Sequence, residues 1–207
     1  MIIHIISGFS GLALGTINII RKKVGKQHRQ IGRLFVFFMV STGISSLILA
    51  LIHPNVFLFI IGVLTVYLVG TGDRYMRLRL LGKGQKPAFI DWFLTLGMLL
   101  SGCYFIGKGS YLIYYSEQVG IIMLVFGLIG LINVRMDIRN YLGNQKKANY
   151  WMLIHIGRMM GSYISALTAF IVVNAQNFPF EVPQLIIWLG PTFLLVPLSI
   201  NWSKPYK

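Results

Sequence analysis

The sequence predicts an all-α integral membrane protein, a single bundle of seven transmembrane helices. Of its 207 residues, 56% are hydrophobic and only 12% are charged, whereas about a quarter of the residues in a soluble domain are charged. The mean hydropathy is +0.70, and polar residues gather between the apolar runs instead of forming polar helix faces. An ordinary soluble helical domain is therefore excluded.

Seven apolar runs are long enough to form helices that cross the hydrocarbon core, which takes about 20 residues. In chain order they cover residues 2–20, 31–52, 55–72, 89–108, 119–134, 150–174 and 183–202. The first run has no basic residue before it and no Ala-x-Ala-type site after it, so we expect a retained helix and not a cleaved secretory signal. With Cys103 as the single cysteine, no internal disulfide is expected. We expect residues 1–207 to form one domain.

The gaps after the first, third and fifth predicted helices are strongly basic. Seventeen of the 19 Lys and Arg residues lie in these gaps or in the tail, namely Arg21, Lys22, Lys23, Lys26, Arg29, Arg33, Arg74, Arg77, Arg79, Lys83, Lys86, Arg135, Arg139, Lys146, Lys147, Lys204 and Lys207. Short loops rich in Lys and Arg stay in the cytoplasm, so we expect the amino terminus outside and the carboxyl terminus in the cytoplasm. These loops should attract anionic lipid headgroups. This topology accounts for the net charge of +14 without nucleic acid as a partner.

The first predicted helix has one small and polar side when residues are placed 100° apart. That side carries His4, Ser7, Gly8, Gly11, Gly15 and Asn18. A similar seam follows the fifth helix through Gly127, Gly130, Asn133 and Asp137. Because small residues let helix backbones approach closely in a membrane, we expect the first helix to pack against the sixth.

The sixth predicted helix carries a histidine and an arginine about one turn apart in HIGRMMGSYISALTAF, residues 155–170. We expect its interior face to hold these two residues and a ladder of small residues formed by Gly157, Gly161, Ser165 and Ala169. The opposite face, which includes Met160, Tyr163 and Phe170, is expected to meet lipid. The sixth helix should therefore lie centrally in the bundle.

An ionised side chain inside a membrane costs about 2.5 to 3.5 kcal/mol and usually faces a partner in the protein interior. We expect Asp137 to pair with Arg158, because the fifth and sixth helices are consecutive and antiparallel. With two histidines at similar depth, these residues predict a polar cluster just inside the cytoplasmic surface. The candidate ligand-binding set is His155, Arg158, His28, Asp137, Asp91, Tyr163, Asn133, Asn18 and His4. In the alternative, purely structural role, Arg158 extends to the interface and His155 bonds a neighbouring backbone group.

Short matches also suggest an internal repeat. The segment Gly-Thr-Ile-Asn at 15–18 corresponds to Gly-Leu-Ile-Asn at 130–133, and Ile-Gly-Arg occurs at both 31–33 and 156–158. Two three-helix units, helices 1–3 and 5–7, would then be joined by the fourth helix. Parallel repeats of this kind place substrate sites near the repeat interface in some transporters.

The histidines also raise the alternative of b-type haem, which takes paired histidines from facing helices. Two pairs are available by depth, His28 with His155 on the inner side and His4 with His53 on the outer side. Ligands must share one depth inside the bundle, and His28 and His53 lie at or beyond the ends of the second helix. The sequence favours haem less than the other roles of histidine.

At HRQIGR, residues 28–33, and HIGRMMGSYISALTAF, residues 155–170, the chain resembles small bacterial membrane proteins related to domain of unknown function 2306. The resemblance covers most of the chain, including His4, the Val-Val-Asn of 172–174 and residues 188–191. It implies a multi-pass protein of the bacterial cytoplasmic membrane and marks His4, His28, His155, Arg158 and Tyr163. It implies no activity.

Three function classes remain open from the sequence. The first is a transporter or binding protein for a small solute, perhaps coupled to protons, with the polar cluster lining a cytoplasmic cavity between the first, fifth and sixth helices. The second is a haem-containing redox protein, and the third is a scaffold or sensor subunit. Phosphate-binding loops, zinc motifs and nucleophile elbows are absent from the sequence, so no catalytic residue and no metal site are assigned. A homo-oligomer is compatible with every class.

Overall fold

The computed structural model describes residues 1–21, 23–145, 147–178 and 182–206. Within these residues, seven helices are long and apolar enough to cross a membrane, and no β-strand occurs. They are α1 (Ile2–Ile20), α2 (Lys26–Ile52), α3 (Val56–Tyr75), α4 (Phe89–Tyr114), α5 (Val119–Tyr141), α6 (Tyr150–Asn174) and α7 (Gln184–Ser203). The prediction of a multi-pass helical membrane protein is confirmed. Lys22, Lys146 and Lys207 lie outside the described residues.

Most helices are longer than the apolar runs that predicted them. Only α1 and α6 have the expected bounds, and α7 differs by one residue at each end. The start of α2 lies at Lys26 instead of residue 31, and the ends of α3, α4 and α5 move outward to Tyr75, Tyr114 and Tyr141. The length of an apolar run reflects the thickness of the hydrocarbon core. A helix, in contrast, continues as long as its backbone N–H and C=O groups stay hydrogen-bonded. Polar residues near the membrane surface are therefore helical here.

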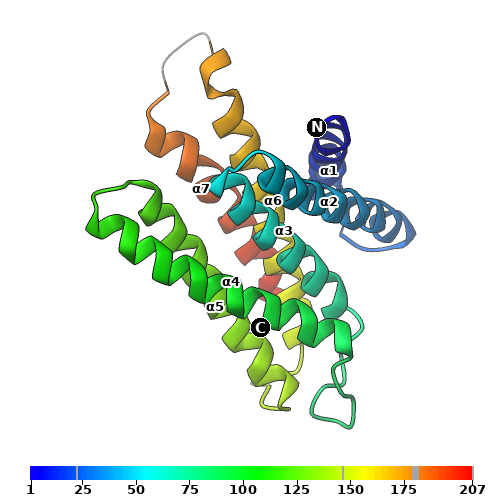
Figure 1. Ribbon diagram of the computed structural model, residues 1–207. Helices are drawn as coiled ribbons and strands as arrows, with labels where there is room; N and C mark the ends of the chain where they lie inside the picture. Colours follow the sequence, from blue (N-terminus) through cyan, green and yellow to red (C-terminus); the bar gives the residue numbers. More distant parts are fainter. Residues whose placement is uncertain (22, 146, 179–181, 207) are drawn as a thin grey trace.

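Helix α3 is the centre of the bundle. It packs against α2, α4, α5 and α6, while α1 packs on the far side of α2 and α7 packs on α6. Figure 1 shows α4 and α5 side by side as a long antiparallel pair, with α1 and α2 on the other side of α3. The proposed internal repeat stays a prediction.

The small face of α1 packs mainly on α2, and it makes the predicted contact with the sixth helix to a lesser extent. A Cβ added at Gly8 would contact Thr42, and one added at Gly11 would lie 2.7 Å from the Met39 sulfur. Only near the end of the helix does the seam reach α6, where Gly15 lies against the ring of Tyr163. A short connection between consecutive antiparallel helices favours this pairing.

Helix α6 lies centrally, and its buried residues include Arg158, Ser162, Ser165 and Thr168 of the predicted interior face but also residues of the opposite face. Gly157 is exposed and has no neighbour within 4 Å of an added Cβ, so the ladder of small residues is not a close helix contact at this position. Met160 and Tyr163, assigned to lipid, are 5% and 7% exposed. They pack with Phe35, Met39 and Val69, because α6 has neighbours on several sides.

A close backbone contact lies between α4 and α5. A Cβ added at Gly120 would lie 2.6 Å from the carbonyl oxygen of Gly109, and Gly130 lies against the side chain of Met98. The glycine seam of the fifth helix therefore serves the α4–α5 pair, as small residues do in membrane bundles.

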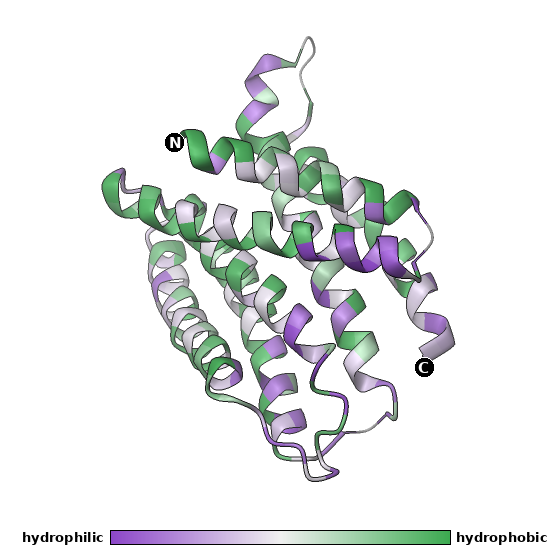
Figure 2. Ribbon diagram, turned by 90° about the vertical axis from the view of Figure 1, so that its right-hand side faces the viewer, coloured by the Kyte–Doolittle hydropathy of each residue, from purple (hydrophilic) through white to green (hydrophobic). Residues whose placement is uncertain are grey.

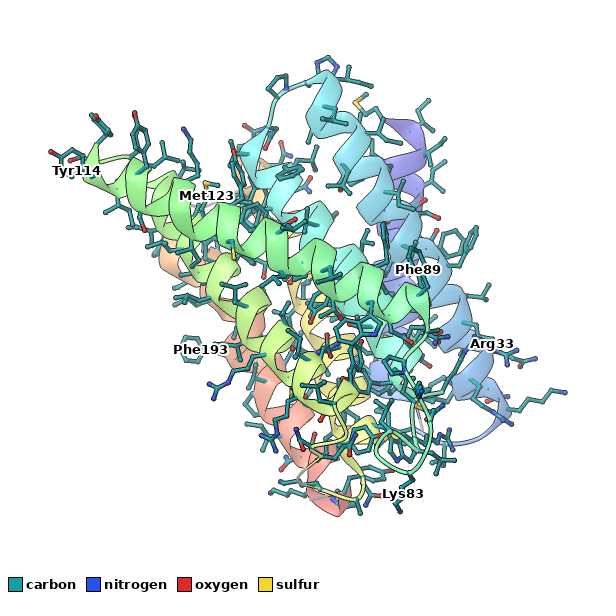
Figure 3. The ribbon with its side chains drawn as sticks, turned by 60° about the horizontal axis from the view of Figure 1, so that its bottom comes forward. Arg33, Lys83, Phe89, Tyr114, Met123 and Phe193 are labelled. Carbon is teal, nitrogen blue, oxygen red and sulfur yellow. The ribbon has the colours of Figure 1, made fainter. Side chains whose placement is uncertain are left out.

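The loops after α1, α3 and α5 lie at one end of the bundle, which we call the basic end. The α3–α4 and α5–α6 loops touch where Gly82 meets Gly143, and the Lys23 ammonium lies 4.3 Å from the centre of the Trp202 ring near the end of α7. Figure 2 shows hydrophobic residues along the helices, with hydrophilic colour on these loops and at the start of α2. Figure 3 places Lys83 at the basic end and Tyr114 at the opposite end. Which side of a membrane the basic end faces stays a prediction.

Candidate functional site

The predicted ion pair between the fifth and sixth helices is present. An Nη2 hydrogen of Arg158 on α6 is donated to Oδ1 of Asp137 on α5 at 2.6 Å. The two side chains are 2% and 0% exposed. The same Nη2 lies 3.3 Å from the backbone carbonyl oxygen of Asn133. The pair is therefore buried inside the bundle. Arg158 does not extend to the membrane interface, which is what the purely structural alternative had proposed.

Asp137 accepts hydrogen bonds from three hydroxyl groups as well as from the arginine. The Tyr67 hydroxyl donates to Oδ2 at 2.6 Å and the Tyr75 hydroxyl donates to Oδ1 at 2.7 Å. Thr95 on α4 adds a longer bond of 3.3 Å to Oδ2. Four donors from α3, α4 and α6 thus surround one carboxylate, which offsets the cost of burying its charge.

The network continues from this carboxylate toward the basic end. The Tyr141 hydroxyl lies 3.2 Å from the Thr95 hydroxyl. Because Thr95 has one proton and gives it to Asp137, Tyr141 donates to Thr95. The amide of Asn140 donates to the Tyr75 hydroxyl at 3.2 Å. The arginine network, as we name it, comprises Arg158, Asp137, Tyr67, Tyr75, Thr95, Asn140 and Tyr141.

Arg158 retains unused hydrogen-bond donors inside this network. Its guanidinium lies 5.1 Å from the ring centres of both Tyr67 and Tyr75, which favours the cation through the ring faces. Its Nε and Nη1 atoms are buried and have no hydrogen-bond partner among the described residues. Buried donors are rarely left unpaired, so Nε and Nη1 of this guanidinium could each donate to a small acceptor.

Aromatic rings close the arginine network from the basic end. Tyr75 stacks on Tyr141 at 6.4 Å and meets Tyr150 edge to face at 6.3 Å, while Trp92 lies 5.1 Å from Tyr141. We call these four residues the aromatic cap. Tyr150 also holds the α3–α4 loop, because its hydroxyl donates to the Leu78 carbonyl and accepts from the Leu81 N–H. The network is therefore occluded in this structure.

A second ion pair lies nearer the basic end. Arg74 donates from Nε and Nη2 to the two oxygens of Asp91 at 2.6 and 2.8 Å. Asp91 also accepts the Ala88 N–H at 2.7 Å, which caps the start of α4. Asp91 therefore joins α3 to α4 and pairs with Arg74, not with Arg158.

The histidines occupy separate places. Nδ1 of His155 lies 2.9 Å from the Gly72 carbonyl oxygen on α3, and His28 is close enough to His155 for their charges to interact. His4 lies between α1 and α2, 3.2 Å from the Ser45 hydroxyl. His53 is exposed at the end of α2, about two turns beyond the serines near His4. The inner histidines thus lie near one another, while the outer two do not share a site.

The structure divides the predicted cluster into two parts at the point where α6 crosses α3. A Cβ added at Gly72 would lie 3.2 Å from the Cβ of Arg158, so the two helices touch here. His155 bonds to the Gly72 carbonyl and lies toward His28, whereas Arg158 reaches Asp137 on α5. One helical turn of α6 therefore carries residues of two sites.

The remaining predicted residues lie outside the arginine network or touch only its edge. Asn133 contributes its backbone carbonyl, while its side chain bonds Ile129 of its own helix. Tyr163 forms a hydrogen bond of 2.6 Å with the Thr16 hydroxyl between α1 and α6. Asn18 lies near Gly32 of α2, and its Oδ1 is buried without a partner among the described residues.

Sequence reasoning missed the hydroxyl donors of the network. Tyr67, Thr71 and Tyr75 recur every four residues in an otherwise apolar helix, and all three are buried. That spacing places them along one side of α3, and it was the available signal. Thr95 stands alone in its stretch of α4, so no local pattern marks it.

No protein-family model, curated protein or solved structure matches the chain. The resemblance to the family of domain of unknown function 2306 therefore stays a prediction. Among the described residues, no three His, Cys, Asp or Glu side chains form a group that could hold a metal ion. The site must be interpreted from its own geometry.

Proposed function

We propose that the protein binds a small anionic solute and moves it across the bacterial cytoplasmic membrane, with the basic end in the cytoplasm. The observation that carries this proposal is the buried Arg158, which is paired with Asp137 and has two further donors without a partner among the described residues. Ionisable residues buried in membrane helices are costly and commonly mark a substrate or proton pathway.

The proposed substrate carries a carboxylate or phosphate group. A guanidinium presents its donors as a planar fork that matches such anions, and here Asp137 occupies one Nη2 position only. When a solute anion binds to Arg158, Asp137 must lose its countercharge.

The loss of that countercharge couples transport to protons. A carboxylate without its cationic partner in an apolar site becomes neutral by taking up a proton. One anion and one proton would then enter together, and the net charge of the site would stay constant. Tyr67 and Tyr75 keep Asp137 in place during the exchange.

The aromatic cap acts as the cytoplasmic gate in this proposal. The cap covers the arginine network from the basic end, and this cover supports the proposed gate. The proposed access path lies between α3, α4, α5 and α6, in place of the cavity between α1, α5 and α6 that the sequence suggested. A scaffold or sensor subunit is the alternative, and haem is tested by the absorbance spectrum of the purified protein.

The test is proton uptake into proteoliposomes that contain a pH-sensitive dye. Gradients of lactate, succinate or inorganic phosphate are imposed without a pH gradient. Wild-type protein should acidify the lumen with at least one of these probes, and Arg158→Lys should abolish uptake because it removes the planar fork while keeping the charge.

The matched control is Arg74→Lys in the outer ion pair, which should transport at close to the wild-type rate. If no probe moves protons, and Arg158→Lys differs from wild type in stability alone, the structural role is correct and the transport proposal is rejected.

A further inference from the structure

A groove on the membrane-facing side of α4 and α5 combines an apolar floor with two arginines. Its volume is about 530 Å³, and its lining includes Leu99, Cys103, Leu131, Arg135, Ile138 and Arg139. This lies within the usual range for small-molecule sites, about 300–1,000 Å³. The groove is shallow and open, so a molecule bound in it would also contact the surrounding bilayer.

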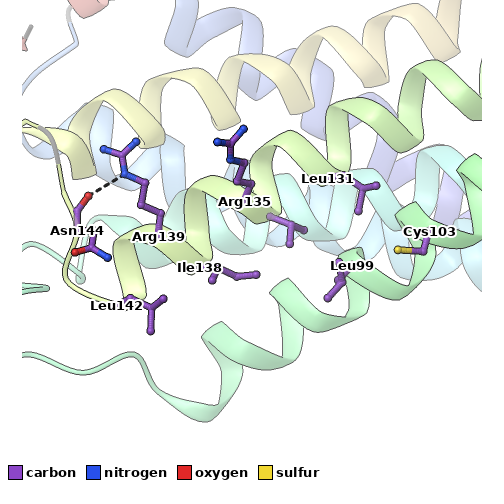
Figure 4. A pocket seen from close by; sticks show the side chains of 9 residues that line it. Leu99, Cys103, Leu131, Arg135, Ile138, Arg139, Leu142 and Asn144 are labelled. Carbon is purple, nitrogen blue, oxygen red and sulfur yellow. Dashed lines mark hydrogen bonds between the residues drawn. The ribbon is translucent and has the colours of Figure 1, made fainter.

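The two arginines of the groove lie on the same face of α5. Their i, i+4 spacing brings their Cβ atoms within about 6 Å of each other. Figure 4 shows both guanidinium groups extending in the same direction. Arg139 donates from Nε to the Asn144 carbonyl oxygen at 2.9 Å, which fixes its position. Arg135 is exposed and has no ion-pair partner within the described part of the chain.

The charge around this pair of arginines is unbalanced. None of the residues that line the groove is acidic. Asp137 lies between the two arginines in sequence, but its carboxylate is buried inside the bundle and bonded to Arg158. A doubly charged cationic site therefore faces outward without an internal anion.

The groove is polar at one end and apolar at the other. Arg139 lies two residues before the end of α5 at the basic end, where loop charges gather. Leu131 lies eight residues earlier, about 12 Å deeper along the helix axis, and Cys103 lies fourteen residues into α4, about 21 Å from its start at Phe89. The apolar part thus extends into the hydrocarbon while the arginines stay near headgroup level.

We infer that this groove binds an anionic phospholipid, with its phosphate on Arg135 and Arg139 and one acyl chain along Leu99, Leu131 and Ile138. Basic pockets between membrane helices on the cytoplasmic side are suited to anionic headgroups. Two arginines hold a phosphate by charge-assisted hydrogen bonds, and the apolar floor accepts the chain. The site is separate from the arginine network, so this inference does not depend on the proposed transport function.

The single cysteine provides a direct reporter, because Cys103 is exposed and lines the groove. The protein is labelled there with bimane and placed in phosphatidylcholine vesicles that contain doxyl-labelled lipid, with either a phosphatidylglycerol or a phosphatidylcholine headgroup. Wild-type protein should be quenched about tenfold more efficiently by the anionic lipid at low mole fraction. Free inorganic phosphate at millimolar concentration should not reverse this preference, because it lacks the acyl chain.

Arg135→Gln with Arg139→Gln should remove the preference, so that both doxyl lipids quench equally. The matched control is Arg29→Gln with Arg33→Gln, since these exposed arginines have the same spacing on α2 and the same charge loss. The control should keep the preference. The inference is overturned if the wild-type protein does not discriminate between the two headgroups, or if the control loses as much preference as the groove variant. A wild-type preference that free phosphate reverses would also overturn it, because that site would bind the ion alone.

Discussion

Replacement of Arg158 by methionine, which removes the charge but keeps an unbranched side chain, should destabilise the protein strongly. The variant leaves Asp137 as a buried carboxylate with only its three hydroxyl donors. Removal of one partner from a buried ion pair costs about 3–5 kcal/mol in soluble proteins. Because Asp137 keeps its hydroxyl bonds and becomes neutral by protonation, we expect the lower value, about 3 kcal/mol.

The partner variant, Asp137→Asn, should cost a similar amount for a different reason. An arginine cannot lose its proton in a protein, so Arg158 would stay buried as a cation that faces only neutral groups. The double variant removes both charges and keeps an acceptor for Tyr67 and Tyr75. It should cost about 1–2 kcal/mol, less than either single variant, because no unpaired charge remains.

The assay is equilibrium unfolding in mixed dodecyl maltoside and dodecyl sulfate micelles, followed by far-ultraviolet circular dichroism. Arg77→Met provides the comparison, because its ion pair with Asp73 is exposed, at 71% and 36% of the two side chains, and an exposed pair contributes at most about 1 kcal/mol. The reasoning would be refuted if the loss of unfolding free energy in the double variant equalled the sum of the two single losses, or if Arg158→Met lost less than about 1 kcal/mol. Either result would show that the two charges do not stabilise each other.

Three further predictions concern packing, the basic loops and orientation. Gly120→Ala should destabilise the α4–α5 pair by about 1–3 kcal/mol through overpacking, because its Cβ would lie 2.6 Å from the Gly109 carbonyl oxygen. Gly157→Ala, where space is open, should be neutral or stabilising in the same unfolding assay. Equal changes in the free energy of unfolding of the two variants would contradict this packing. Tyr150→Phe should speed tryptic cleavage after Lys83 about thirtyfold, since two lost hydrogen bonds of about 1 kcal/mol each release the α3–α4 loop, whereas the exposed Tyr115→Phe should cleave at the wild-type rate. An unchanged rate for Tyr150→Phe would mean that its hydroxyl does not hold the loop. If the basic end is cytoplasmic, a fluorescent-protein fusion at the carboxyl terminus should fluoresce and an alkaline phosphatase fusion after residue 115 should be active. A carboxyl-terminal fusion that does not fluoresce, with an inactive phosphatase fusion, would reverse the proposed topology.

The ion pair of Arg158 and Asp137 was predictable because each residue is an expensive exception in an apolar helix. Few acidic residues occur near the basic end, so the choice of partner was small. The reason given for the pairing was incomplete, however. Helix α6 packs chiefly on α3 and α7, whereas α5 packs chiefly on α4. The long arginine side chain reaches α5 beside the tyrosines of α3.

The amino-acid sequence alone determined that this chain forms seven membrane helices, because hydrocarbon thickness and backbone pairing leave a long apolar segment no other structure. It also marked Arg158 and Asp137 through the cost of burying charge. The tertiary structure decided which helices touch, because apolar helices in lipid have no hydrophobic preference for one neighbour and pack by local shape. For that reason Gly157 is exposed, Tyr163 is buried, Asp91 pairs with Arg74, and the hydroxyls of α3 and α4 complete the arginine network.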